Sequence, residues 1–196
     1  MQLLALDIAL LPPPEVRQRA IELNATLAAT AVQELQLDED HQPHITLAQL
    51  FIRAEELYAV LERVNQVVRS LRPMVVDVTG GGHHAGTIVM EIGRTPRLLE
   101  LHEQLMESLR GYERPGGTRA AFVDADGRVG DVMWVTSYRL KSALHAYAPH
   151  VTLGHGDQVP AIEPFSFEAD TVAAYHLGRM CTCRRVLRSW ELTKPE

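Results

Sequence analysis

Apolar residues recur along the chain with two spacings, which alternate from one segment to the next. Steps of three and four residues over 16–35 and 57–71 place apolar side chains on one face of a helix, so both segments are predicted to be helical. A third helix is predicted over 96–109, because Thr95 followed by proline is typical of a helix cap and first turn. A helical or irregular piece is expected over 137–147.

Shorter runs of apolar and β-branched residues, bounded by proline, glycine or acidic residues, predict strands. These runs cover 2–11, 44–52, 74–79, 87–92, 150–153, 164–174 with 175–180 after it, and 183–192. The glycines within 80–86 predict a hairpin connection. The polar segment 111–130 is expected to be a long surface insertion that is mobile or closes over a site. Strands and helices in mixed order, several strands being joined as hairpins, indicate an α+β fold with mainly antiparallel sheet.

The composition is that of an ordinary soluble globular protein, with 46% hydrophobic and 22% charged residues among 196. This length suits one well-buried domain, which is predicted to span 1–196 as two lobes that share a core. The formal net charge of −6 argues against a protein that grips long nucleic-acid duplexes through a broad basic surface. It leaves room for a small anionic ligand held by a local cluster.

The chain is expected to be a cytoplasmic monomer without a membrane partner. Its first residues lack a basic segment, and Asp7 interrupts a short apolar run, so no signal peptide is predicted. No apolar stretch approaches the ~18 residues of a membrane span. Cys181 and Cys183 are the only cysteines and stand too close together to be bridged readily, which favours reduced thiols.

One pentapeptide occurs twice, as Pro-His-Ile-Thr-Leu at 43–47 and as Pro-His-Val-Thr-Leu at 149–153. Side chains alternate between the two faces of a strand, so each copy is predicted to present a histidine and a threonine on one face and its aliphatic residues to a core. The histidine–threonine pairs are His44 with Thr46 and His150 with Thr152. The alternative is two amphipathic strands whose polar faces carry these residue types by chance.

Two imidazoles that flank one reacting centre can divide proton transfer between them. The neutral ring takes a proton from water or a hydroxyl group, and the protonated ring gives a proton to the leaving oxygen. Threonine hydroxyls two residues further along can stabilise the charge on phosphoryl oxygens. The four groups therefore suit in-line displacement at a phosphodiester without a metal, and no cofactor is expected.

Other polar residues are weaker candidates. Tyr147, close to the second pentapeptide, either stacks on a nucleobase or packs in the interior. His83 and His84 are expected at a loop tip, where His83 is a possible substrate contact. The glycines before them are followed neither by a helix start nor by Lys-Ser/Thr, which excludes a P-loop. His102 is expected to be a satisfied structural histidine.

The paired pentapeptides resemble the signature of the 2H phosphoesterase superfamily, in the branch of 2′-5′ RNA ligases and RNA 2′,3′-cyclic phosphodiesterases. The resemblance extends to an opening apolar strand that ends in prolines, a strand–glycine–strand hairpin before helix 96–109, and a closing segment over 175–192. It implies a bilobal α+β fold with two mainly antiparallel sheets, flanking helices, internal pseudo-twofold symmetry and a central cleft.

The resemblance also implies roles and a substrate. His44 and His150 would be the general acid and base, and Thr46 and Thr152 would bind phosphate. The substrate would be the 2′,3′-cyclic phosphate of an RNA end or a nucleotide, with 2′-5′ ligation or 2′-5′ phosphodiester cleavage as alternatives in the same cleft. The chain departs from the family where the hairpin carries histidines instead of an aromatic residue, and in the longer segment 111–130.

Two further classes of function stay open at this point. The first is a non-catalytic module that binds nucleotides or RNA ends in the same cleft. The second is a histidine-rich metal protein, in which the pair His41 and His44 has a spacing that metal sites use. Its candidate ligands would be His41, His44, His145, His150 and His155.

Overall fold

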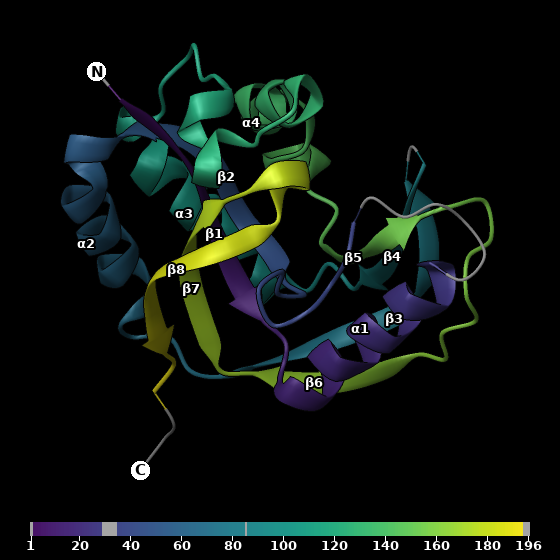
Figure 1. The fold of residues 1–196 in the computed structure, drawn as a ribbon. Helices are drawn as coiled ribbons and strands as arrows, with labels where there is room; N and C mark the ends of the chain where they lie inside the picture. Colours follow the sequence, from purple (N-terminus) through teal and green to yellow (C-terminus); the bar gives the residue numbers. More distant parts are fainter. Residues whose placement is uncertain (1, 29–34, 85, 194–196) are drawn as a thin grey trace.

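The sheet of this protein contains eight strands, every adjacent pair of which is antiparallel, in the order β6-β3-β4-β5-β2-β1-β7-β8 (Figure 1). The computed structural model describes residues 2–28, 35–84 and 86–193. The strands are β1 (Leu3–Leu11), β2 (Ile45–Arg53), β3 (Met74–His84), β4 (Thr87–Ile92), β5 (His150–His155), β6 (Phe165–Ala169), β7 (Thr171–Leu177) and β8 (Cys183–Glu191). The predicted α+β class with antiparallel sheet is confirmed.

The sheet consists of two four-stranded halves that meet at a single residue pair, Ile45 of β2 opposite Val151 of β5. The order of strands is symmetric about this seam, because each motif strand pairs with the strand that precedes it in the chain (β1 beside β2, β4 beside β5) and two further strands lie outside that pair. Both halves carry an irregularity at the same place. The register shifts next to Ala9, which faces Thr46, and next to Val89, which faces Thr152. The two sheets expected from the sequence are therefore the two halves of one curved sheet.

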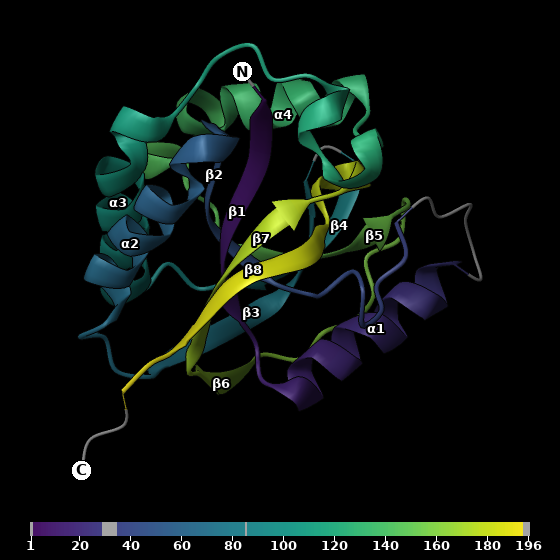
Figure 2. The same ribbon diagram turned by 60° about the vertical axis from the view of Figure 1, so that its left-hand side comes forward.

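Four helices cover the sheet, namely α1 (Pro14–Ala28), α2 (Leu57–Val68), α3 (Pro96–Leu109) and α4 (Val129–Lys141). Helices α2 and α3 lie together beside β2, whereas α1 lies along the other half and contacts β5 (Figure 2). Buried residues of α2 recur every fourth position, at Val60, Val64 and Val68, and they join the main core. Helix α4 also contacts β2. None of the helices in the described ranges is long and apolar enough to cross a membrane.

The structure corrects two boundaries that the sequence predicts, and a third falls outside the described residues. The first helix is described only to Ala28, and the expected continuation over 29–34 lies outside the described residues. The third strand runs on through its glycines to His84 rather than ending at Thr79, because glycine can pair in a ladder as well as turn. The fourth helix begins at Val129, ahead of the expected 137.

The segment 111–130, expected to be a surface insertion that is mobile or closes over a site, is anchored in the core at a point that the sequence does not predict. Ala121, Phe122 and Val123 are buried, and the first two belong to a second, smaller core with Phe51 of β2. The rings of Phe51 and Phe122 meet edge to face, with their centroids 5.9 Å apart. Gly127 lies so close to Phe122 that an added Cβ would stand 2.3 Å from the ring. The segment is polar in overall composition, and its three buried residues 121–123 were therefore not predicted from the sequence.

Candidate active site

The two repeated pentapeptides meet at the seam of the sheet. His44 directly precedes β2, and His150 is the first residue of β5. Alternation along each strand sends the aliphatic residues into the core, where they are at most 1% exposed (Ile45, Leu47, Val151 and Leu153). The histidines and threonines are half-buried on the opposite face.

His44, Thr46, His150 and Thr152 all line one cavity of about 570 Å³. The cavity lies over the seam, and helix α4 and the turn at 180–182 form its remaining wall. Small-molecule and cofactor sites commonly have volumes of ~300–1,000 Å³, so this cavity has room for a nucleotide. The four motif residues thus come from two distant parts of the chain to a single site.

The two motif histidines are oriented in the same way. Nδ1 of His44 donates a hydrogen bond to the carbonyl of Gln42 at 2.7 Å, and Nδ1 of His150 donates to the carbonyl of Ala148 at 2.8 Å. Because a carbonyl oxygen can only accept, both rings carry their proton on Nδ1 when they are neutral. In each ring Nε2 remains to accept a proton from, or donate a proton to, a bound molecule.

Asp7 of β1 lies beneath the first motif and was not singled out from the sequence as a site residue. Its side chain is completely buried. Carboxylate Oδ2 accepts hydrogen bonds from Thr46 Oγ1 at 2.9 Å and Gln49 Nε2 at 2.5 Å, and it lies 4.0 Å from His44 Nε2. Burial raises the pKa of Asp7, while the charge of His44 and these two hydrogen bonds lower it. In the sequence the only signal of Asp7 was a charge inside an apolar strand.

The second motif has no carboxylate in the corresponding place. Asp7 pairs with Gln49 across β1 and β2, and the equivalent pair across β4 and β5 is Thr87 with His155. His150 instead faces His84, whose ring centroid lies 5.7 Å away. Burial lowers the pKa of His150, and the charges of His84 and His44 lower it further, against a rise from the bond to Ala148. The two imidazoles therefore have the same geometry in unlike electrostatic surroundings.

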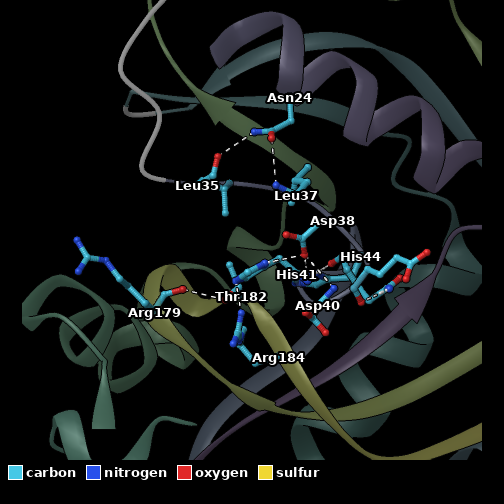
Figure 3. A network of polar contacts seen from close by, with 12 residues as sticks. Asn24, Leu35, Leu37, Asp38, Asp40, His41, His44, Arg179, Thr182 and Arg184 are labelled. Atoms are coloured by element: carbon cyan, nitrogen blue, oxygen red, sulfur yellow. Dashed lines mark hydrogen bonds and ion pairs between the residues drawn. The ribbon is translucent and has the colours of Figure 1, made fainter. Parts of the chain in front are cut away.

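Asn24 ties the approach to the first motif to the second motif strand. Its buried side-chain amide donates hydrogen bonds to the carbonyls of Leu35 at 3.0 Å and Leu153 at 2.8 Å, and it accepts one from the amide of Leu37 at 3.0 Å. Figure 3 shows Asn24 above the segment that leads through Asp38 to His44. A single side chain of α1 thus connects both strands of the site.

The two weaker candidates lie in different surroundings. Tyr147 is only 2% exposed, its ring stacks on buried His102 with centroids 3.7 Å apart, and its hydroxyl donates to the carbonyl of Thr46 at 2.8 Å. These contacts favour the packing interpretation of Tyr147 over stacking on a base. His83 points away from the cavity and contacts the carbonyl of Gly156, whereas its neighbour His84 lines the cavity. Neighbours on a strand face opposite ways, which separates the two histidines.

His102 has the structural role that the sequence predicts. It is fully buried, its Nδ1 donates to the carbonyl of Leu47 at 2.6 Å, and its Nε2 accepts from the amide of Leu144 at 2.7 Å. Burial lowers the pKa of His102, so the neutral ring satisfies both bonds.

The histidines considered as metal ligands form no group with metal-like spacing in the described part of the chain. His41 uses both ring nitrogens for protein contacts, one with Asp38 Oδ1 at 2.7 Å and one with Arg184 (Figure 3). The group with metal-like spacing among the described residues is Asp7, His44 and Cys183. Burial raises the pKa of the Cys183 thiol well above its ordinary value, which opposes the thiolate form that a metal needs. Cys181 and Cys183 are both free, as expected.

Solved structures share this fold over nearly their whole length. TT0787 of Thermus thermophilus superposes with a TM-score of 0.69 at 18% identity, covering 96% of this chain and 98% of that one. LigT of E. coli complexed with ATP gives a TM-score of 0.63 at 19% identity over 98% and 100% of the two chains. Its complex with 3′-AMP gives 0.64 at 18% identity over 99% and 100%. Identities this low establish the fold alone.

No curated protein sequence matches the chain. The sequence model of the 2′-5′ RNA ligase superfamily, however, matches residues 12–173, which include both histidine–threonine motifs. The match spans far more than half of the chain, and the folds compared above agree with it. The chain belongs to the 2′-5′ RNA ligase superfamily of 2H phosphoesterases.

Proposed function

We propose that this protein is a phosphodiesterase that opens the 2′,3′-cyclic phosphates of nucleotides or RNA ends by two-histidine acid–base catalysis without a metal. The observation that carries the proposal is the pair of imidazoles in one cavity, each held through Nδ1 by a carbonyl two residues earlier and each with Nε2 left for proton transfer. Membership of a phosphoesterase superfamily supports an enzymatic role.

The unlike surroundings of the two rings support a division of roles. His150 is the general base, because its lowered pKa keeps the ring neutral and able to accept a proton. His44 is assigned as the general acid by elimination, and its Nε2 lies 4.0 Å from Oδ2 of Asp7. Nε2 of His150 takes a proton from water as the water oxygen bonds to phosphorus. Nε2 of His44 gives its proton to the ribose oxygen as the bond from that oxygen to phosphorus breaks, which leaves a monoester.

The threonines stabilise the charge on the non-bridging oxygens in this scheme. Thr152 contributes its hydroxyl from β5. The hydroxyl of Thr46 donates to Asp7 in the ligand-free site, so it reaches the phosphate only when Asp7 holds a proton of its own or the hydroxyl rotates.

The complexes of E. coli LigT with ATP and with 3′-AMP indicate the class of ligand. 3′-AMP is one of the two monoesters that opening of 2′,3′-cyclic AMP yields. We extend nucleotide binding to this chain on the strength of the shared fold and the size of its cavity.

The decisive experiment measures turnover of 2′,3′-cyclic AMP and of an RNA that ends in a cyclic phosphate, both in EDTA. Wild type should turn over at least one of them, and His44→Ala and His150→Ala should each lose at least about 100-fold in kcat, the lower end of what a positioned acid or base contributes. His145→Ala is the matched control, because His145 is exposed and outside the cavity lining.

Activity that survives in both cavity variants would overturn the assignment of the site. Turnover that EDTA abolishes would overturn the metal-free mechanism. Absence of turnover on both substrates would contradict the proposed reaction and favour 2′-5′-linked oligonucleotides or a binding module.

A further inference from the structure

Trp134 is a large aromatic residue that is fixed in place and still exposed at the cavity. It lies on α4, lines the cavity wall, and is 44% exposed. Its indole Nε1 donates a hydrogen bond to Oε1 of buried Gln49 at 2.9 Å. One turn further along α4, the ring of Tyr138 lies 6.4 Å away at an interplanar angle of 65°. The indole is therefore held at one edge while much of its surface stays open.

Two other exposed apolar residues of α4 lie outside the cavity. Val129 and Met133 are more exposed, at 70% and 64%, but neither belongs to the cavity lining. An aromatic ring that is exposed to water lacks the favourable free energy of burial. A ligand that covers the ring with an apolar face would supply that free energy. The hydrogen bond to Gln49 prevents the ring from recovering that energy by turning inward.

A chain of contacts connects Trp134 with the first motif. Gln49 accepts from the indole through Oε1 and donates through Nε2 to Asp7 Oδ2 at 2.5 Å. Asp7 in turn lies 4.0 Å from Nε2 of His44. The indole is thus linked through Gln49 and Asp7 to the surroundings of His44.

We propose that Trp134 is the platform on which the nucleobase of the substrate stacks, so that the substrate is a cyclic phosphate carrying a base and not a small base-free cyclic ester. The inference rests on the proposed function and adds a preference for substrates that carry a nucleobase. Stacking suits this site because every base has a π-face, and aromatic platforms bind bases with little sequence preference. Discrimination among the four bases is accordingly expected to be weak.

The kinetic test compares two substrates in Trp134→Ala. KM for 2′,3′-cyclic AMP should rise about tenfold, within the range expected for one base–aromatic stack, and KM for glycerol 1,2-cyclic phosphate should not change. Trp134→Phe should keep most of the affinity for cyclic AMP, because a ring remains. Met133→Ala, one residue earlier and outside the cavity lining, should leave both substrates unaffected.

Equal losses on the two substrates would overturn the inference and indicate a purely structural role for Trp134. Unchanged KM for cyclic AMP would overturn it as well. Both results leave the two-histidine mechanism intact, because that mechanism is tested by the histidine variants in EDTA.

A binding measurement decides the matter even without turnover. The chain has two tryptophans, and the other, Trp190, is 8% exposed. In Trp190→Phe, 3′-AMP should quench the fluorescence of Trp134 and inorganic phosphate should not. Equal quenching by both ligands would overturn the proposal that Trp134 is the platform. Absence of quenching by either ligand, while calorimetry records binding of 3′-AMP, would overturn it as well. If the Trp190 variant is unstable, the fluorescence of wild type is compared with that of Trp134→Phe instead.

Discussion

The proposed general base, His150, faces a histidine from another strand that affects its pKa. It must be neutral to accept a proton, so the rate should fall as the pH drops through its pKa. Burial lowers that pKa, and the charge of His84, from the tip of β3, lowers it further. The acidic limb of the pH–rate profile is thereby placed below the ordinary histidine value of ~6.5.

Replacing His84 should move that limb. His84→Asn removes a positive charge 5.7 Å from the His150 ring, so the pKa of His150 should rise and the acidic limb of kcat/KM should shift to higher pH. The measurement is the pH profile of cyclic AMP hydrolysis between pH 4 and 9. His83→Asn is the matched control, because His83 lies outside the cavity lining and should leave the profile unchanged. A limb that stays in place in both variants would show that His150 is not the titrating base.

At the scale of elements, the sequence predicts most reliably what is local. The strands and helices follow from their apolar spacing, and both motifs follow from a short repeat. Burial of Phe122 depends on Phe51, which is distant in sequence, and no local pattern reveals that contact. Asp7 and Trp134 were missed for the same reason, because their importance comes from partners on other elements.

The segment 119–125 should behave as part of the core. Phe122→Ala removes a ring that is 2% exposed and should lower the free energy of unfolding by about 3–5 kcal/mol, the usual cost of emptying a buried phenylalanine site. Urea denaturation measures the difference. Asp124→Ala is the comparison, because Asp124 is exposed in the same segment. A loss below about 1 kcal/mol for Phe122→Ala would restore the picture of a loose insertion.

On the scale of the whole molecule, the two halves of the sheet differ in what lies beneath their motif histidines. Asp7 in β1 corresponds to Thr87 in β4, and only the first half places a carboxylate beneath its histidine. Symmetry of the fold was expected from the resemblance to the 2H phosphoesterase superfamily. The inequality of the halves was not, because it depends on which residues pair across the strands.

Asp7→Asn should lower the activity and raise the stability of the protein at pH 7. Removing the carboxylate leaves His44 without its facing charge, so kcat should fall by about 10–100-fold, part of the contribution of a positioned acid. The folded state raises the pKa of Asp7 above its unfolded value of 3.8, so native protein binds more protons between the two values and loses stability as the pH rises through them. Asparagine does not ionise, so the Asp7→Asn variant does not lose stability in this way as the pH rises.

The variant should therefore be more stable than wild type at pH 7, with the difference vanishing near pH 3, as measured by urea denaturation at both values. A variant that is less stable at pH 7 and equally active would show that Asp7 has a structural role alone.

The carbonyl two residues before each motif histidine has a consequence for how such a protein can change over time. His44 stands above Asp7 and His150 stands beside His84, yet both rings adopt the same orientation, since the carbonyl that holds each one directly precedes its own pentapeptide. A catalytic unit that carries its own support places few demands on distant residues. Mutations elsewhere can then alter acidity through Asp7 or selectivity through α4 without disturbing the geometry on which the chemistry depends.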